Sequence, residues 1–270
     1  MHSYAQTNLQ LFNQLSHSGY SKAELNLIYN AYQLVMELFT GGFRSSGKTF
    51  IAHLVGTASI LASLGAPGKI VAAGLLHAAY TNGDFGEGKK GINNAKRDKI
   101  RLALGEEVEE YIARYTALQW NEKNILAICD RIDTLNSIER DVLLIRLTNE
   151  LEEYLDLGIL YCGELKYQRY VNHSCNLMVE MAEKLGFPTL AKQLATTFQE
   201  TTVAEIPSEL RNRSGQNISF VIAPNSYQKK VSLVFYSWVF SKLRRLKSVI
   251  RHRLDRFSST ISAIGKTDLI

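Results

Sequence analysis

The sequence has few cysteines and no long apolar run. Its three cysteines, Cys129, Cys162 and Cys175, lack the CxxC spacing of a zinc knuckle or a redox pair. An odd number of cysteines without that spacing excludes a disulfide framework, so we expect reduced, buried thiols. No segment approaches the roughly 18 apolar residues of a membrane span, and the N-terminus lacks the apolar core of a signal peptide. We therefore expect a cytoplasmic protein.

Two-residue alternation, the mark of half-buried strands, is nearly absent before residue 216. The chain instead repeats apolar residues three and four positions apart, as between Ala23 and Thr40, which is typical of helices that bury one face. With 46% hydrophobic residues it can bury a full core. We predict an all-α helical bundle over residues 1–200, a linker at 201–225 with a short strand in NISFVIAP, and a helical tail at 226–270.

The net charge of +5 is unevenly placed. Residues 226–257 hold nine Lys or Arg against one acidic residue, so this segment carries +8 and the rest of the chain −3. Its apolar residues recur in steps of three and four, which predicts a basic amphipathic helix. Such a helix docks on the bundle, pairs with another chain as a homo-oligomer, or lies on an anionic membrane surface. Its aromatic residues cluster at one end, so we expect no nucleic acid partner.

The stretch GFRSSGKT at 42–49 satisfies the G-x-x-x-x-G-K-[ST] pattern of a phosphate-binding loop. Such a loop joins a buried parallel strand to a helix, whose N-terminus faces the phosphates. Here a helical pattern precedes the loop, and strands do not alternate with helices along the chain. Nucleotide triphosphate binding through Gly42–Thr49 stays an alternative hypothesis.

The same residues fit a second pattern. RSSGKTFIAHLVGTASIL places Arg44 and His53 at the start of a helix, and AAGLLHAAY places His77 24 residues further on. LALGEEVEEYIARYTAL and LIRLTNELEEYLDL follow in the same order. These segments resemble the HD superfamily of helical phosphohydrolases, and within it the hydrolase domain of the RelA/SpoT-type alarmone enzymes. The resemblance covers about residues 25–160 and implies an HD-domain-like helical bundle.

In that family two histidines and two aspartates hold a divalent metal, and a nearby acidic pair activates water. Carried over by position, His53 and His77 are retained. The other family carboxylates fall on Ala78, Thr81, Asn82 and Asn149. Two imidazoles and an amide bring no negative charge to a hard cation such as manganese. The resemblance thus implies a site with no metal and no other cofactor, in which the family's hydrolysis does not run.

The resemblance also implies roles for the residues around the two histidines. We expect a polar cavity lined by candidate catalytic groups and, at its mouth, by ligand-binding groups. The first set is His53, His77, Asn149 and Tyr80, and the second is Arg44, Ser46, Lys48, Thr81 and Asn82. The simpler alternative for the histidines is a hydrogen-bonded core position, and for Arg44, Ser46 and Lys48 a solvated turn.

Three hypotheses for function follow. The first is a degenerate HD-like domain that binds a small, phosphorylated ligand in the histidine cavity. The second is an enzyme that uses His53 and His77 as acid and base, or as ligands of an altered metal site. Carboxylates available for such a site are Asp84, Asp130, Asp133, Glu150, Glu152 and Glu153, although charged runs such as NELEEYLD are typical of solvated helix faces. The third is the phosphate loop.

Overall fold

The computed structural model describes residues 4–88, 90–162, 174–210 and 220–224. Contacts divide the chain into two units, residues 1–221 and 222–270. The predicted basic tail helix lies outside the described residues. The domain boundaries at residues 200 and 225 stay predictions.

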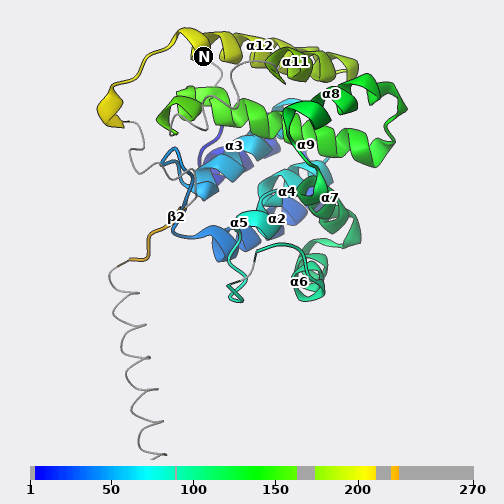
Figure 1. The fold of residues 1–270 in the computed structure, drawn as a ribbon. Coiled ribbons are helices and arrows are strands. Elements are labelled where there is room, and N and C mark those ends of the chain that lie inside the picture. The colour runs from blue at the N-terminus through cyan, green and yellow to red at the C-terminus, as the bar shows by residue number, and fades with distance from the viewer. Residues whose placement is uncertain (1–3, 89, 163–173, 211–219, 225–270) are drawn as a thin grey trace, which may run out of the picture. The chain divides into compact units, whose positions relative to one another are not determined.

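The described part of the first unit is mostly helical and has almost no strand, which confirms the predicted all-α class (Figure 1). The α-helices are α1 (Asn8–His17), α2 (Lys22–Phe39), α3 (Phe50–Ser63), α4 (Gly68–Leu76), α5 (Ala79–Asn82), α6 (Asn94–Leu104), α7 (Glu106–Ala117), α8 (Glu122–Asp130), α9 (Ser137–Tyr154), α11 (Ser174–Lys184) and α12 (Pro188–Val203). The 3-10 segments are η1 (Ile132–Thr134), η2 (Leu155–Tyr161) and η3 (Ser208–Leu210), and the strands are β1 (Gly42–Phe43) and β2 (Phe220–Val221).

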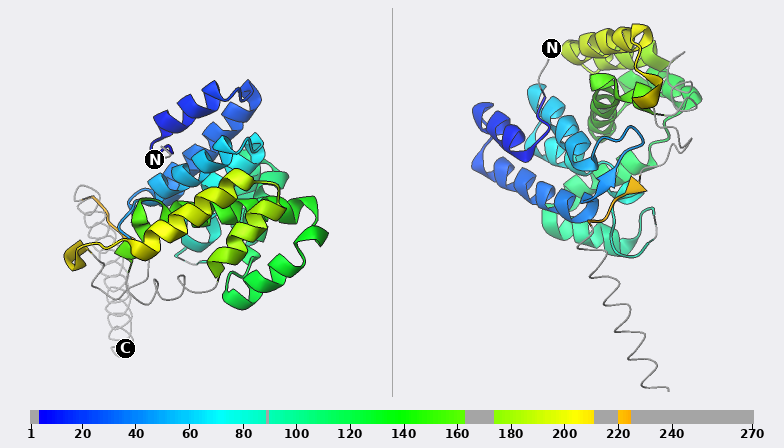
Figure 2. Two further views of the ribbon diagram at one scale, coloured as in Figure 1. Left: turned by 90° about the horizontal axis from the view of Figure 1, so that it is seen from above. Right: turned by 90° about the vertical axis from the view of Figure 1, so that its left-hand side faces the viewer.

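Two apolar helices, α3 and α4, form the centre of the bundle. All residues of α3 from His53 to Ala62 are buried, and so is every residue of α4 except Lys69. A helix that is apolar on all sides belongs inside a protein. Helix α3 packs against α1, α2, α4 and α9, and α4 packs also against α2, α7 and α9. Figure 2 shows this central pair between the N-terminal helices and the group of α9, α11 and α12.

Three segments with continuous helical periodicity are broken in the structure. Helices α6 and α7 separate at Gly105, whose φ of 88° leaves the helical region. Helix α4 ends before His77, and α5 starts after it. Helix α9 ends at Tyr154, and Asp156 and Leu157 follow with φ of 56° and 58°. The spacing of apolar residues continues through these breaks, because that spacing depends on which side chains are buried and not on the backbone angles. The breaks therefore could not be located from the apolar pattern.

The loop between α2 and α3 lacks the architecture of a phosphate-binding loop. Strand β1 pairs antiparallel with β2, and Phe43 lies opposite Phe220 with their rings stacked at 5.3 Å. Within the described ranges this antiparallel pair is the only sheet, so no parallel strand leads into α3. The glycine loop instead connects two helices of the bundle.

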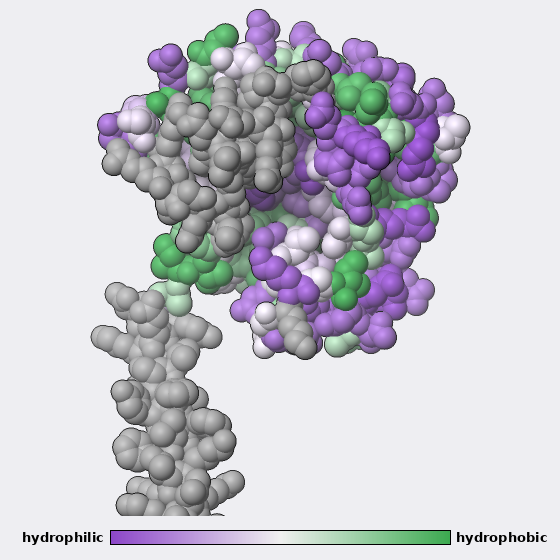
Figure 3. All heavy atoms as spheres, viewed as in Figure 1, coloured by the Kyte–Doolittle hydropathy of each residue, from purple (hydrophilic) through white to green (hydrophobic). Residues whose placement is uncertain are grey.

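Where the face drawn in Figure 3 shows described residues, its surface is mostly polar. Apolar side chains gather beside β2, where Phe220 and Val221 are exposed by 40% and 74%. In the part of the chain that the structure describes, no helix has the length and apolar character needed to span a membrane.

Candidate functional site

The structure brings His53 and His77 into direct contact. His53 comes from α3 and His77 follows the end of α4, and both side chains are buried. Their Nε2 atoms lie 3.3 Å apart, and the ring planes meet at 76°. At that distance one ring donates an N–H and the other accepts it.

The surroundings of the two rings determine which one donates. His77 Nδ1 lies 2.8 Å from the carbonyl oxygen of Gly74, which can only accept, so this nitrogen carries a hydrogen. Burial, with the charges of His53, Arg44 and Arg146, holds the pKa of His77 well below its usual range. His77 is therefore neutral at pH 7 and its Nε2 accepts. The Nε2 of His53 must then be the donor.

Glu152 of α9 lies on the other side of the His53 ring. Its Oε2 contacts His53 Nδ1, and its Oε1 contacts Lys48 Nζ. Burial raises the pKa of Glu152 to about 7, although the charges of Lys48 and Arg44 act in the opposite direction. A continuous polar chain thus runs from Lys48 through Glu152 and His53 to His77.

Arg44 makes a second connection between the glycine loop and α9. Its guanidinium pairs with Glu153 and lies 5.5 Å from the centre of the Phe50 ring. Burial opposes the charged form of Arg44, but the carboxylates of Glu153 and Glu152 outweigh it and raise the pKa of Arg44. Two ion pairs therefore tie the loop to the last turn of α9.

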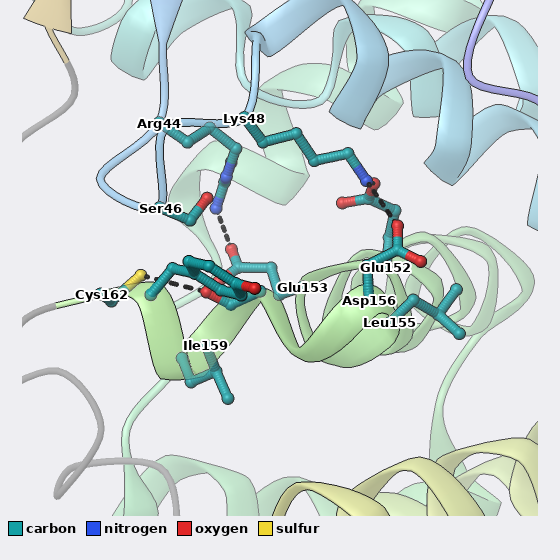
Figure 4. Close-up of a pocket in the computed structure, with 11 residues that line it drawn as sticks. Arg44, Ser46, Lys48, Glu152, Glu153, Leu155, Asp156, Ile159 and Cys162 are labelled. Atoms are coloured by element: carbon teal, nitrogen blue, oxygen red, sulfur yellow. Dashed lines mark hydrogen bonds and ion pairs between the residues drawn. The ribbon is translucent and has the colours of Figure 1, made fainter. Parts of the chain in front are cut away.

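These side chains form one wall of a pocket of about 270 Å³, which we call the Arg44 pocket (Figure 4). It is lined by Arg44, Ser46, Lys48, Glu152, Glu153, Leu155, Asp156, Gly158, Ile159, Tyr161 and Cys162. Figure 4 shows Arg44, Ser46 and Lys48 reaching from the loop toward the helix that carries Glu152 and Glu153. The lining includes three predicted ligand-binding residues, Arg44, Ser46 and Lys48. It does not include His53 or His77, because Glu152 lies between the pocket and the His53 ring.

A second polar group lies against His77. The ring of Tyr115 is 4.9 Å from that of His77, and its hydroxyl accepts a hydrogen bond from Arg146 Nη1 at 3.1 Å. Arg146 also lies over the Trp120 ring, at 4.9 Å, and pairs with Glu150. Burial raises the pKa of Tyr115 to about 12, so its hydroxyl stays protonated at neutral pH.

The remaining predicted site residues lie in different places. Asn149 is buried on α9, one turn before Glu152. The Tyr80 hydroxyl donates to Glu109 at 2.6 Å, in a cluster with arginines of α6. Thr81 donates to the side chain of Asn82 at 2.9 Å. Tyr80, Thr81 and Asn82 do not line the Arg44 pocket.

The donor set does not fit the metal that the family resemblance implies. Glu152 contacts Nδ1 of His53 and His77 contacts Nε2, so the carboxylate and the second imidazole lie on opposite sides of one ring. Ala78 has no donor atom at the family's aspartate position. Over the described ranges, no three His, Cys, Asp or Glu side chains are grouped as a metal site. Asp84, Asp130 and Asp133 are exposed on a loop, on α8 and on η1.

The sequence pattern did not indicate that the acidic residues at the end of α9 are buried. NELEEYLD resembles a solvated face, yet the side chains of Glu150 and Glu152 are 0% and 2% exposed. One available signal was the spacing of Glu152 and Glu153, three and four residues after Asn149 on a helix with an apolar flank. Tyr115 carried no such signal, because its partners His77 and Arg146 come from other elements. Arg146 did carry one, since Glu150 follows it four residues later on the same helix.

The fold and site thus define a helical bundle with a buried histidine pair beside a pocket of mixed charge. Comparison with family models matches residues 34–119 to a domain of unknown function, DUF6817. This range holds the glycine loop and both histidines, but not Glu152.

Among curated proteins, the chain is similar to the probable chloroplastic GTP diphosphokinase RSH3 of Oryza sativa subsp. japonica. The two are 26% identical over 166 residues, which covers 57% of this chain and 22% of the relative. The chain thus spans about a fifth of the relative's length. The similarity is distant, and it agrees with the RelA/SpoT-type resemblance of the sequence motifs.

Proposed function

We propose that this chain is a degenerate HD-like domain that binds a small, nucleotide-related ligand in the Arg44 pocket and does not carry out metal-dependent alarmone hydrolysis. The observation that carries the proposal is the joining of Arg44, Ser46 and Lys48 with Glu152 and Glu153 in one pocket beside the histidine pair. The similarity to a GTP diphosphokinase supports a nucleotide-related ligand.

The charges of the pocket narrow the ligand class. Two cations, Arg44 and Lys48, face three carboxylates, those of Glu152, Glu153 and Asp156. A bare phosphate would meet more negative than positive charge. A ligand that brings both phosphate oxygens and N–H or O–H donors satisfies both sets, since arginine and lysine only donate and carboxylates accept. A nucleotide has this combination, with Ser46 as an added hydroxyl.

The test compares inorganic phosphate, guanosine, GDP and GTP by thermal shift and titration calorimetry. We expect GDP or GTP to bind at least about tenfold more tightly than either fragment. Arg44→Met should abolish that binding. Arg114→Met, which removes an exposed arginine paired with Glu110, is the matched control and should leave it unchanged. Equal affinity for phosphate and GDP would contradict a nucleotide pocket.

The absence of hydrolysis is tested separately. With Mn²⁺ added, the purified chain should not turn over guanosine tetraphosphate, because carboxylates are missing at Ala78, Thr81, Asn82 and Asn149. Turnover that requires stoichiometric metal would show that the positional correspondence is wrong.

One observation favours a second candidate, an enzyme that uses the histidines as acid and base. Glu152 contacts one imidazole, that of His53, which in turn contacts the imidazole of His77, and an acid–base group oriented by a further side chain is typical of such enzymes. His53 and His77 would exchange the proton with a substrate in the Arg44 pocket through Glu152. Ligand turnover without metal, lost in His53→Gln, would support this candidate over simple binding.

A further inference from the structure

The last turns of α9 carry three buried or half-buried carboxylates, and each has a cation as partner. Glu150 pairs with Arg146 on the same helix, whereas Glu152 and Glu153 pair with Lys48 and Arg44 from the glycine loop. Carboxylates this close together repel each other, and burial raises the free energy of each charged form. The loop cations are thus part of what allows α9 to bury its acidic end.

Lys48 has the central position in this arrangement. Its Nζ contacts Glu152 Oε1 and lies 3.8 Å from Asp156 Oδ2. The other oxygen of Glu152 holds His53, and His53 holds His77. Lys48 is therefore in ion-pair contact with the carboxyl group that contacts His53 and, through His53, is linked to His77.

The loop backbone presents Lys48 in this position through a tight turn. The Arg44 amide donates to the Lys48 carbonyl at 2.8 Å, and the Gly47 amide donates to the Arg44 carbonyl at 2.9 Å. Gly47 has a φ of 87°, in the left-handed region that favours glycine. The segment from Gly47 to Thr49 matches the sequence pattern of a phosphate-binding loop, but in this structure it positions the Lys48 side chain against the buried carboxyl group of Glu152.

We propose that Lys48 is the built-in structural cation of the site: it balances the charge of Glu152 and so holds the His53–His77 pair without a divalent ion. The donor set already disagrees with the metal that the family resemblance implies. Lys48 supplies the positive charge beside the histidines from within the chain. This inference does not depend on which ligand the Arg44 pocket binds.

The test is a double-mutant cycle on thermal stability. Lys48→Met keeps the aliphatic stem and leaves Glu152 buried without its cation, so the melting temperature should fall by about 5 to 10 °C. Adding Glu152→Gln should recover at least half of the loss, because no buried charge then needs balancing. Lys69→Met is the matched control: it breaks an exposed pair with Glu107 and should shift the melting temperature by less than about 2 °C.

Two further measurements test whether Lys48 acts through its positive charge or only through the packing of its side chain. The imidazole ¹⁵N signals of His53 and His77 at one pH should change in Lys48→Met, return in Lys48→Arg, and stay unchanged in Lys69→Met. A chelator should leave the melting temperature of the unaltered chain unchanged, and elemental analysis should find no stoichiometric metal.

Additive effects of Lys48→Met and Glu152→Gln would overturn the proposal, and so would a metal whose removal lowers the melting temperature. If Lys48→Met does not fold, the double variant decides. A double variant that folds supports the proposal that Lys48 balances the charge of Glu152. A double variant that does not fold counts against that proposal. None of these measurements uses a ligand, so they can fail or succeed independently of the nucleotide-binding test.

Discussion

Two buried glutamates show how the surroundings of a residue set its chemistry. Burial raises the pKa of Glu152 to about 7. Burial acts in the same direction on Glu109, but hydrogen bonds from Arg97 and Tyr80 and the charge of Arg97 outweigh it, so the pKa of Glu109 is lowered. A carboxyl group held near neutral pKa in a pocket is typical of a functional site, whereas one locked by arginines is typical of a structural cluster. Tyr80 donates its hydroxyl hydrogen to the carboxylate that these arginines hold.

This difference predicts how stability depends on pH at Glu109. Its folded pKa lies below the unfolded value of 4.5, so Glu109 stabilises the fold above that pH, and this contribution is lost as the pH falls through the folded pKa. Glu109→Gln should cost about 1 to 3 kcal/mol at pH 7 and progressively less below pH 4.5. Urea unfolding at several pH values measures the change. Asp98→Asn, at an exposed residue 3.9 Å from Arg101, is the control and should alter stability by less than about 0.5 kcal/mol.

The two histidines should differ in what their removal costs. His53→Ala leaves Glu152 without one partner and opens space at a residue with no exposure, so we expect a loss of about 2 to 4 kcal/mol. His77→Ala gives up the hydrogen bonds with Gly74 and His53 and the ring contact with Tyr115 but leaves no charged group without its partner, and it should cost about 1 to 2 kcal/mol. Both variants should lose ligand binding. Retained affinity in the folded fraction would instead assign the pair to the core alone.

At the scale of elements, the site depends on the close approach of α3 and α9. Gly56 lies on α3, and a Cβ at this position would be 2.9 Å from Glu152 Cγ and 2.8 Å from Glu152 Oε1. Real Cβ atoms do not come this close, so Glu152 has its place beside His53 because α3 carries glycine there. The glycine is inside a helix, where it is otherwise unfavourable.

Gly56→Ala should therefore move Glu152 away from Lys48 and His53. We expect a loss of stability of about 1 to 3 kcal/mol together with weakened ligand binding. Gly68→Ala on α4 is the comparison: its added methyl would meet Glu24 Cβ and Cγ at 2.7 Å, away from Glu152 and the histidine pair. It should lower stability but leave ligand affinity unchanged. If both variants lose ligand binding equally, the effect is on the core as a whole.

At the scale of the whole molecule, the basic tail remains a sequence prediction. Its apolar stripe and nine cationic residues predict docking on the bundle, pairing between chains, or contact with an anionic membrane surface. We favour docking within or between chains. The exposed apolar side chains of Phe220 and Val221 show that the first unit keeps apolar surface at β2.

A chain ending at residue 225 tests this. With docking, the truncated chain should melt at a lower temperature, or an oligomer should become a monomer by light scattering. Because β2 is retained, such a change would report on the tail alone. Unchanged size and melting temperature, with loss of sedimentation on anionic lipid vesicles, would instead assign the tail to a membrane surface.

The sequence by itself determined the helical class and the pairing of His53 with His77 as candidates. The helical class is recorded in local spacing, because apolar residues three and four apart define a buried helix face. The pairing of His53 with His77 rested on the resemblance to the HD-domain motifs. The same resemblance singled out Arg44, Ser46 and Lys48, which the structure places in the lining of one pocket.

Only the tertiary structure decided which charges are buried. Lys48 and Glu152 are 104 residues apart in sequence, and no periodicity links them. A run such as NELEEYLD is solvated on most helices, and here Glu152 is buried and Glu153 half-buried because Gly56 lets α3 approach α9 and the glycine loop supplies two cations. A buried charge depends on partners from distant elements, and packing alone brings those partners together.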